Sequence, residues 1–213
     1  MTLETEGPRP MPHILLDDQT RRSRVTYDPE FLDAQAADTL FAFMSASTPF
    51  HAEAPVMFGR PVEVRRRTFS YGDPGTRYRY SGVERVATPW PAPFHKLLDR
   101  LEQRVGVRFG FALCNLYPDG GASIGWHSDD EADLAAGMPI ASVSLGATRD
   151  FVMRVGRSGP ACVSVSLAHG SLLVMSGETQ AHFQHAVPKR TRCREPRINL
   201  TFRVMKRTEL VQQ

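Results

Sequence analysis

Residues 197–203 alternate between polar and apolar side chains, and this pattern constrains the fold more than any other part of the chain. Successive side chains of a β-strand point to opposite faces, so the alternation predicts a strand with one polar and one apolar face. The polar positions are Arg197, Asn199, Thr201 and Arg203, and the apolar positions are Ile198, Leu200 and Phe202. We therefore expect a core on one side of this strand and a cationic, hydrogen-bonding site on the other.

The polar face of this strand suits a dicarboxylate. An arginine guanidinium binds a carboxylate through two parallel hydrogen bonds, and alternate strand positions supply two separated cations for a diacid such as 2-oxoglutarate. A basic edge strand that limits aggregation is the alternative, but edge protection does not require Asn199 and Thr201 between the arginines. Asn115 and Tyr117 share a face of a second predicted strand and are candidates to complete the pocket, with ordinary strand packing as the alternative.

A His-Ser-Asp fragment at residues 127–129 places an imidazole and a carboxylate on one face of an extended segment. Two imidazoles and one carboxylate make the facial triad of non-haem Fe(II) oxygenases, so a further histidine is needed. His185 is preferred, because an offset of three residues turns His182 to the opposite strand face and His169 precedes a glycine in a predicted turn. The same ligand types also serve zinc, and the dicarboxylate strand favours iron.

The chain of 213 residues is 41% hydrophobic, which suits one large β-rich domain, alone or with helices. No apolar run reaches membrane-spanning length and the first residues lack a secretory pattern, so no membrane partner is expected. Cys114, Cys162 and Cys193 form an odd set without metal-type spacing, which favours free thiols in a reducing compartment.

The N-terminal half is predicted to support a β core. Residues 1–24 are expected to form a flexible extension. Asp28 and Pro29 are expected to begin one helix, and a second helix with apolar positions from Phe94 is expected to end at Gly106. Beyond it the apolar period becomes two, and short strands are expected at 109–117, 123–128, 140–146, 150–155, 161–167, 171–175, 182–187 and 196–205. This succession predicts an α+β, mainly β fold with a jelly-roll core.

Basic residues gather in two stretches. Residues 185–207 contain eight lysines and arginines against Glu195 alone, and residues 60–79 contain six arginines. Two such patches around an acidic metal motif suit a nucleic-acid substrate, and a solvated basic surface is the alternative.

Seven segments, in order and at matching spacing over residues 55–205, resemble the AlkB family of oxidative nucleic-acid demethylases. They are Asn115-Leu116-Tyr117, Ile124 to Glu131, Pro139 to Gly146, Arg149-Asp150-Phe151, His169 to Leu173, His185, and Arg197 to Arg203. The branch that repairs duplex DNA is resembled most, through Phe69 to Asp73 and Tyr78 to Gly82.

The resemblance implies a double-stranded β-helix core at residues 108–207 under a nucleotide-recognition lid within residues 25–107. It implies Fe(II) bound by His127, Asp129 and His185. It also implies 2-oxoglutarate bound by Asn115, Tyr117, Arg197, Asn199, Thr201 and Arg203, with Arg197 at the distal carboxylate and Arg203 near the carboxylate that chelates iron.

The implied reaction uses Fe(II), 2-oxoglutarate and O₂ to hydroxylate an N-methyl group on a base such as 1-methyladenine or 3-methylcytosine, and releases formaldehyde, succinate and CO₂. A methyl group inside a base stack is out of reach, so the base must be flipped out. Three expected substrate contacts lie in the lid: Tyr78, Tyr80 and Ser81. Tyr80 and the His127 ring are expected to form the walls of the base pocket, with Glu131 contacting the exocyclic group of the base. Phe58 is expected to act as a wedge in a duplex, and Arg190 and Arg192 are expected to contact phosphates. Core packing is the alternative for Tyr80 and Phe58.

Other functions stay open from the sequence. The same iron chemistry serves an RNA demethylase or a protein hydroxylase, and a catalytically silent nucleic-acid-binding jelly roll is a rival from another class. Alkylated DNA is the expected partner, double-stranded first and single-stranded second. The protein is expected to be a monomer in the bacterial cytoplasm beside the nucleoid, or in the nucleus of a eukaryote.

Overall fold

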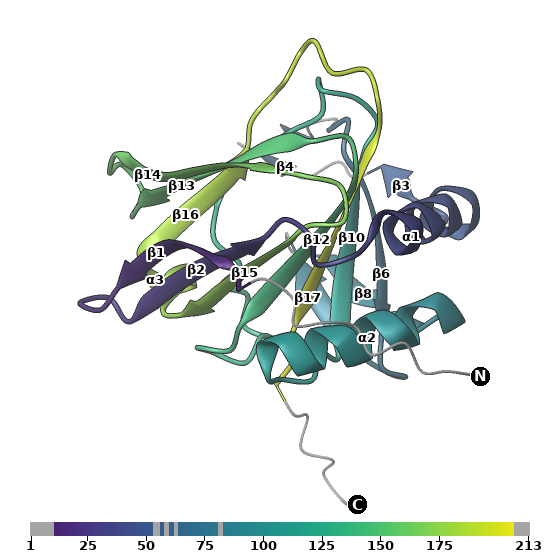
Figure 1. Cartoon of the computed structure of the whole chain (residues 1–213), viewed down its shortest axis with the longest axis horizontal. Helices are drawn as coiled ribbons and strands as arrows, with labels where there is room; N and C mark the ends of the chain where they lie inside the picture. The colour runs from purple at the N-terminus through teal and green to yellow at the C-terminus, as the bar shows by residue number, and fades with distance from the viewer. Residues whose placement is uncertain (1–10, 53–55, 58–59, 62–63, 81–82, 207–213) are drawn as a thin grey trace, which may run out of the picture.

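The computed structural model describes residues 11–52, 56–57, 60–61, 64–80 and 83–206. Strand β17 (Arg197–Arg203) lies in the middle of the larger of two principal antiparallel sheets, between β10 (Phe111–Tyr117) and β12 (Ile140–Gly146) (Figure 1). The sheet continues beyond β12 through β15 (Leu172–Gly177), β2 (Ser23–Asp28) and β1 (His13–Asp18). Beyond β10 it continues through β6 (Arg67–Gly72), which pairs with β3 (His51–Ala52) and β9 (Thr88–Pro89).

The smaller sheet has four strands in the order β11 (Ile124–His127), β16 (Phe183–Val187), β13 (Arg149–Val155) and β14 (Ala161–Leu167). One cavity is lined by residues of both sheets, so the two sheets face each other across it. This arrangement is the mainly β, jelly-roll fold that the strand pattern predicts.

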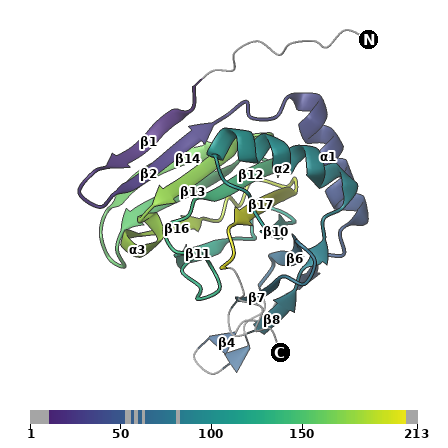
Figure 2. The ribbon, with the colours of Figure 1, turned by 90° about the horizontal axis from the view of Figure 1, so that it is seen from below.

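Two helices cover the other face of the larger sheet, α1 (Ala34–Ser47) and α2 (Ala92–Val105) (Figures 1 and 2). Phe94 of α2 contacts Phe202 of β17, with ring centroids 6.2 Å apart. Ile198, Leu200 and Phe202 are fully buried in this helix-covered core. The helices therefore pack on the apolar face of β17, and its polar face turns toward the smaller sheet.

Two short hairpins stand beside the sheets, β4 (Val56–Met57) with β5 (Arg60–Pro61) and β7 (Arg77–Tyr80) with β8 (Val83–Val86) (Figure 2). A one-turn helix, α3 (Thr179–His182), leads directly into β16. None of the described helices has the length and apolar character needed to cross a membrane.

The prediction of a flexible extension at residues 1–24 is wrong from residue 13 onward. Residues 13–18 and 23–28 form β1 and β2, and β2 pairs with β15 of the larger sheet. Val25 and Tyr27 are buried in the core between the sheets. Their alternate spacing in the sequence is typical of a strand with one buried face. Residues 1–10 lie outside the described part of the chain.

The predicted start of the first helix at Asp28 and Pro29 is also wrong. Asp28 ends β2 and accepts a hydrogen bond from Arg104 at 2.9 Å. The helix begins at Ala34, where the Asp33 side chain caps the free N–H of Ala36 at 2.7 Å. The second helix ends as predicted, because Gly106 adopts φ 79°, a left-handed conformation that favours glycine.

Candidate functional site

A single cavity between the two sheets collects the residues that the sequence singled out for metal and dicarboxylate binding. Its walls include His127, Asp129, His185, Asn115, Tyr117, Arg197, Asn199, Thr201 and Arg203. The cavity therefore joins the two chemistries that the sequence predicted separately.

His127, Asp129 and His185 form the group that could hold a metal ion, with one ligand atom of each lying within 4.8 Å of the others. Strand pairing places His127 directly opposite His185, with ring centroids 4.3 Å apart. The carbonyl of Gly125 lies 2.8 Å from Nδ1 of His127, which orients the ring and leaves Nε2 toward Asp129. A backbone contact of this kind is the usual way that proteins fix a metal-binding imidazole.

Asp129 is 4% exposed, yet it is held as a carboxylate. Burial alone would raise its pKa, but the positive charge of Arg203 and the adjacent histidines outweigh burial and lower the pKa to about 2. Arg203 donates to Asp129 with Nη2 2.9 Å from Oδ2. The anionic form is the one that binds a metal ion.

His185 is held in the neutral form that binds metal. Burial lowers its pKa to about 3, assisted by the charge of His127 and opposed by Asp129. Its ring lies over Phe151, with centroids 5.4 Å apart. Nδ1 of His185 is buried and has no hydrogen-bond partner among the described residues. A neutral imidazole, a second imidazole and an ionised carboxylate fit an Fe(II) facial site.

The short segment around Asp129 is fastened to α3 and β16. The backbone N–H of Asp129 donates to the Gln180 side-chain oxygen at 2.9 Å, and the Ser128 hydroxyl donates to the carbonyl of Phe183 at 2.8 Å. Because His185 lies on β16, these bonds also fix where the carboxylate lies relative to that histidine. Neither Ser128 nor Gln180 was predicted from the sequence to have this role.

The polar face of β17 is a connected hydrogen-bond network. The Asn199 amide donates to the Ser142 hydroxyl at 2.7 Å, and the Thr201 hydroxyl donates to the Asn199 side-chain oxygen at 2.9 Å. On the neighbouring strand, the Asn115 side-chain oxygen accepts a hydrogen bond from buried Arg66. Ordered polar groups of this kind present a fixed surface to a polar ligand.

Arg197 is 1% exposed and has no carboxylate partner among the described residues. Its Nη2 donates to the Ser144 hydroxyl at 2.9 Å and its guanidinium lies 5.2 Å from the centre of the Tyr117 ring, while Nε and Nη1 are buried without a hydrogen-bond partner there. Burial, reinforced by the charge of Arg149 and opposed by Tyr117, lowers the Arg197 pKa to about 10, so the group stays charged at neutral pH. A buried cation with unused donors is suited to a carboxylate ligand.

Four further polar residues support this face, and the sequence analysis gave none of them a role. Arg149 is 1% exposed and donates to the carbonyls of Ala122 and Pro188, both at 2.7 Å. Arg66, Ser142 and Ser144 are buried and contact Asn115, Asn199 and Arg197 respectively. Alternation along residues 140–146 marked that segment as a strand, but not which face its serines occupy.

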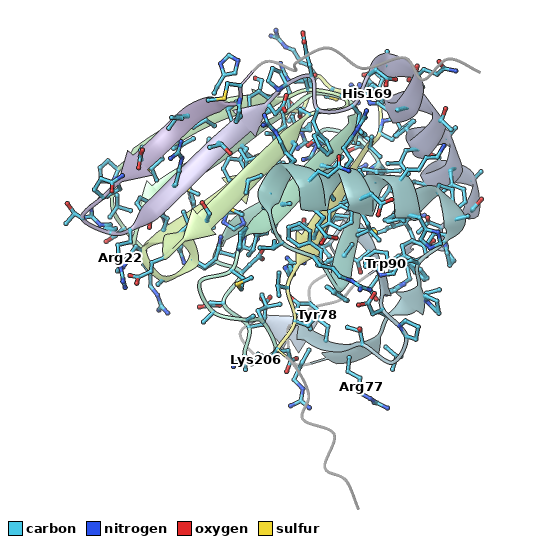
Figure 3. All side chains as sticks on the ribbon, turned by 60° about the horizontal axis from the view of Figure 1, so that its bottom comes forward. Arg22, Arg77, Tyr78, Trp90, His169 and Lys206 are labelled. Atoms are coloured by element: carbon cyan, nitrogen blue, oxygen red, sulfur yellow. The ribbon has the colours of Figure 1, made fainter. Side chains whose placement is uncertain are left out.

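The two rejected histidines lie outside the triad. His182 ends α3 and its Nε2 lies 3.1 Å from Glu178. His169 lies beside α1, at the far end of the molecule from Tyr78, and its Nε2 lies 3.1 Å from Asp38 (Figure 3). Gly170, next to it, has φ 78°, in keeping with the predicted turn.

The predicted substrate contacts are described only in part. Tyr78 is fully buried near the Glu131 carboxylate, and Arg203 lies 5.6 Å from the Tyr78 ring centre. Hairpin β7–β8 thus lies beside the metal-binding group, and Lys206, three residues beyond the end of β17, lies in the same region (Figure 3). Phe58, Ser81 and the side chain of Tyr80 lie outside the described residues.

Arg190 and Arg192 lie in an exposed loop that is hydrogen-bonded to the turn at Gly120. The backbone N–H of Arg190 donates to the carbonyl of Gly120 at 2.8 Å, and Nη1 of Arg190 donates to the carbonyl of Thr148 at 3.0 Å. A side chain at residue 120 would clash with the Arg190 carbonyl, so this close approach requires glycine. The loop therefore has a defined backbone that presents its basic side chains to solvent.

Comparison with known families gives a match to the 2OG-Fe(II) oxygenase superfamily over residues 24–203. The mouse DNA oxidative demethylase ALKBH2 is 44% identical over 154 residues, covering 69% of this chain and 64% of that protein. The human alpha-ketoglutarate-dependent dioxygenase alkB homolog 3 is 38% identical over 192 residues, covering 86% of this chain and 66% of that protein.

This chain spans between 59% and 64% of the length of the mammalian ALKBH2 proteins that it matches. Among solved structures, "The structure of OsALKBH1" superposes with a TM-score of 0.63 at 18% identity, covering 84% of this chain and 96% of that chain. At that identity the likeness concerns the fold alone.

Proposed function

The chain belongs to the AlkB family of 2OG-Fe(II) oxygenases, and on this basis we propose that it oxidatively demethylates N-alkylated bases, with alkylated DNA as its substrate. The observation that carries the proposal is the shared cavity, in which a His-Asp-His group lies beside a buried arginine with unused donors. The relatives named as DNA oxidative demethylases support the choice of substrate.

In the proposed site His127, Asp129 and His185 hold Fe(II). When bound, Fe(II) and 2-oxoglutarate would supply O₂ activation: one oxygen atom goes into succinate as 2-oxoglutarate loses CO₂, and the other hydroxylates the N-methyl group, whose carbon then leaves as formaldehyde. Arg203 keeps Asp129 ionised through their hydrogen-bonded contact, and Gly125 and Gln180 hold the ligands in place through hydrogen bonds. The chain's own contribution is thus to fix three ligand atoms in a buried position.

Arg197 is proposed to bind the distal carboxylate of 2-oxoglutarate. Its buried Nε and Nη1 are the donors available for that contact. Asn115, Tyr117, Asn199 and Thr201 line the same wall and would hold the rest of the molecule. Placing the carboxylate on a buried guanidinium also replaces the water that this cation would otherwise require.

The nucleic acid is proposed to approach from the side of hairpin β7–β8. Tyr78 of that hairpin lies against Arg203, which binds Asp129, so a flipped base entering beside the hairpin would meet the metal site. Exposed Arg190 and Arg192 are proposed phosphate contacts, and Phe58 remains the proposed wedge for a duplex. The proposed compartment is the one that holds the genome, either the bacterial cytoplasm or the nucleus.

Methyl removal from a 1-methyladenine oligonucleotide tests the proposal, using single and double strands with Fe(II), 2-oxoglutarate and ascorbate. His127→Ala serves as the inactive control. Repair by the wild type alone is expected. Succinate formation without base repair would retain the oxygenase chemistry and reject alkylated DNA, in favour of RNA or a protein side chain. DNA binding without 2-oxoglutarate turnover would reject the enzyme altogether.

A further inference from the structure

Trp126 is an exposed aromatic residue beside the metal-binding group. Of the phenylalanine, tyrosine and tryptophan side chains whose exposure is described, Trp126 is the one classed as exposed, at 39%. It directly precedes His127 on β11. The indole is therefore open to solvent beside the candidate metal ligand, where a polymer that reaches the cavity can contact it.

The contact with Arg154 places Trp126 on the outer face of the smaller sheet, since the pairing of β11 with β16 is irregular between Ile124 and His127. His185 pairs with Met153, and both are buried between the sheets; the adjacent pair, Gln184 and Arg154, therefore points outward. The guanidinium of Arg154 lies 4.4 Å from the centre of the Trp126 ring, and its Nη2 donates to the Gln184 side-chain oxygen at 2.9 Å. Arg154 thus covers one face of the indole and is itself held in place.

The surroundings of this pair favour a polar polymer over a protein partner. Ser164 and Ser166 on β14 are exposed outward positions of the same sheet, and Ser166 donates to Asp150 at 2.9 Å. A protein interface needs a contiguous apolar core of several residues, which one indole among hydroxyl and charged groups does not supply. A flat aromatic ring backed by a guanidinium instead matches a nucleotide, since the ring stacks on a base and the cation attracts a phosphate.

The position of β11 connects this platform to the cavity. The strand is one of the two edges of the smaller sheet, and in Figure 2 it forms the margin toward hairpins β4–β5 and β7–β8. A nucleic-acid strand crossing that edge can place one nucleotide on the outer face and another at the cavity. His127 lines the cavity and the adjacent Trp126 contacts the outward-facing Arg154, so the two positions lie on opposite sides of β11.

We propose that Trp126 and Arg154 form a stacking platform for an unpaired nucleotide that flanks the base held in the cavity. The choice of nucleic acid as the bound polymer rests on the proposed function. The platform adds a second base-binding position, on the face of β11 opposite the cavity. An indole stacks only on a base whose face is open, so the platform binds single-stranded nucleic acid in preference to a duplex interior.

Intrinsic fluorescence tests the platform without any catalysis. Trp90 and Trp126 are the two tryptophans, so Trp90→Phe leaves Trp126 as the sole reporter. Metal-free protein is titrated with an unmethylated single-stranded oligonucleotide and with the matching duplex. Saturable quenching that is stronger for the single strand is expected. Unchanged Trp126 fluorescence at oligonucleotide concentrations that saturate binding would overturn the platform.

Affinity measurements with a labelled single strand give a second test. Trp126→Ala is expected to weaken binding by about 5-fold to 150-fold, whereas Trp126→Phe keeps most of the affinity. Arg154→Gln is expected to lower the slope of log affinity against log salt by about 0.7. Ile14→Ala, at a residue 55% exposed on β1, is the control for loss of an exposed apolar side chain.

These outcomes separate the platform from the proposed function. If the protein demethylates oligonucleotides while Trp126→Ala binds them as the wild type does, the platform is rejected and the function stands. If Trp126→Ala loses affinity in a protein that repairs no alkylated base, the platform stands and the proposed function fails. A loss of affinity in Ile14→Ala equal to that in Trp126→Ala would also reject the platform.

Discussion

Arginines occur in two contrasting regions at the C-terminal end of the chain. Arg197 and Arg203 on β17 are 1% and 3% exposed, whereas Arg190 and Arg192 in the loop before that strand are exposed. Burial costs several kcal/mol per ion unless partners replace water, while an exposed cation interacts weakly and is screened by salt. Arginine therefore has two uses here: on the strand it is part of an ordered binding site, and in the loop it contributes to long-range attraction of anions.

The two buried arginines also differ from each other. Arg203 has a carboxylate partner, Asp129, 2.9 Å away. Arg197 has a hydroxyl and an aromatic ring as its contacts among the described residues. This difference indicates that Arg203 belongs to the permanent structure of the metal site, whereas Arg197 keeps donors for a ligand. The predictions below test that distinction first, and then the contrast with the exposed loop.

Replacing Arg203 is expected to have the largest effect. Arg203→Met leaves the buried Asp129 carboxylate without its cation and should lower the free energy of unfolding of the metal-free protein by about 3–5 kcal/mol. Urea denaturation measures this change. Adding Asp129→Asn to the same variant should recover part of the loss, because the unpaired charge is removed. Equal unfolding free energies for wild type and Arg203→Met would show that the pair does not stabilise the fold.

Replacing Arg197 should separate ligand binding from stability. Arg197→Met removes a buried cation without a carboxylate partner among the described residues, so the free energy of unfolding of the ligand-free protein should stay constant or rise. The affinity for 2-oxoglutarate, measured by calorimetry on Mn(II)-loaded protein, should fall on the order of 100-fold, because charge-assisted hydrogen bonds are lost. Arg190→Met is the control. Undiminished 2-oxoglutarate affinity in Arg197→Met would remove Arg197 from the proposed site.

Gln180 is expected to show a smaller effect, on the metal alone. Gln180→Leu removes the acceptor for the Asp129 N–H and should weaken Mn(II) binding about 10-fold to 100-fold, the range seen for groups that orient metal ligands. Gln180→Glu keeps an acceptor oxygen and should bind metal more tightly than Gln180→Leu. Gln184→Leu is the matched control, since Gln184 contacts Arg154 on the outer face. If the loss of Mn(II) affinity in each of the three variants only matches its loss of stability, Gln180 supports the fold and does not orient the metal ligand.

Alternation along one strand correctly predicted which residues share a face. Arg197, Asn199, Thr201 and Arg203 all line the cavity, and Ile198, Leu200 and Phe202 all lie in the core behind them. Side-chain direction along a strand repeats every two residues, so the sequence of one strand is enough to tell which of its residues share a face. His185 was preferred over His182 by the same rule, but its premise is wrong, because His182 lies at the end of helix α3 and the strand begins at Phe183.

The sequence could not supply contacts that depend on how separate segments meet. Arg149 holds the carbonyls of Ala122 and Pro188, which are 27 and 39 residues away, and no local pattern encodes such pairings. Gln180 contacts Asp129 across 51 residues for the same reason. Asp28 was mistaken for a helix cap because Asp-Pro is a strong local signal, whereas the pairing of β2 with β15 and the contact with Arg104 determine its actual position.

The exposed loop should give the smallest effect and complete the contrast with β17. Arg192 has no hydrogen bond or ion pair with other described residues, so Arg192→Ala should leave the free energy of unfolding unchanged within about 0.5 kcal/mol. If Arg192 contacts a phosphate, the slope of log affinity for duplex DNA against log salt should fall by about 0.9, with a few-fold weaker binding at moderate salt. Arg190→Ala should change the same slope and also loosen the loop, because Arg190 bonds the Thr148 carbonyl at 3.0 Å. A salt slope unaltered even in the double variant would place the DNA backbone elsewhere on the protein, and the basic loop would then be a solvated surface like any other exposed charge cluster.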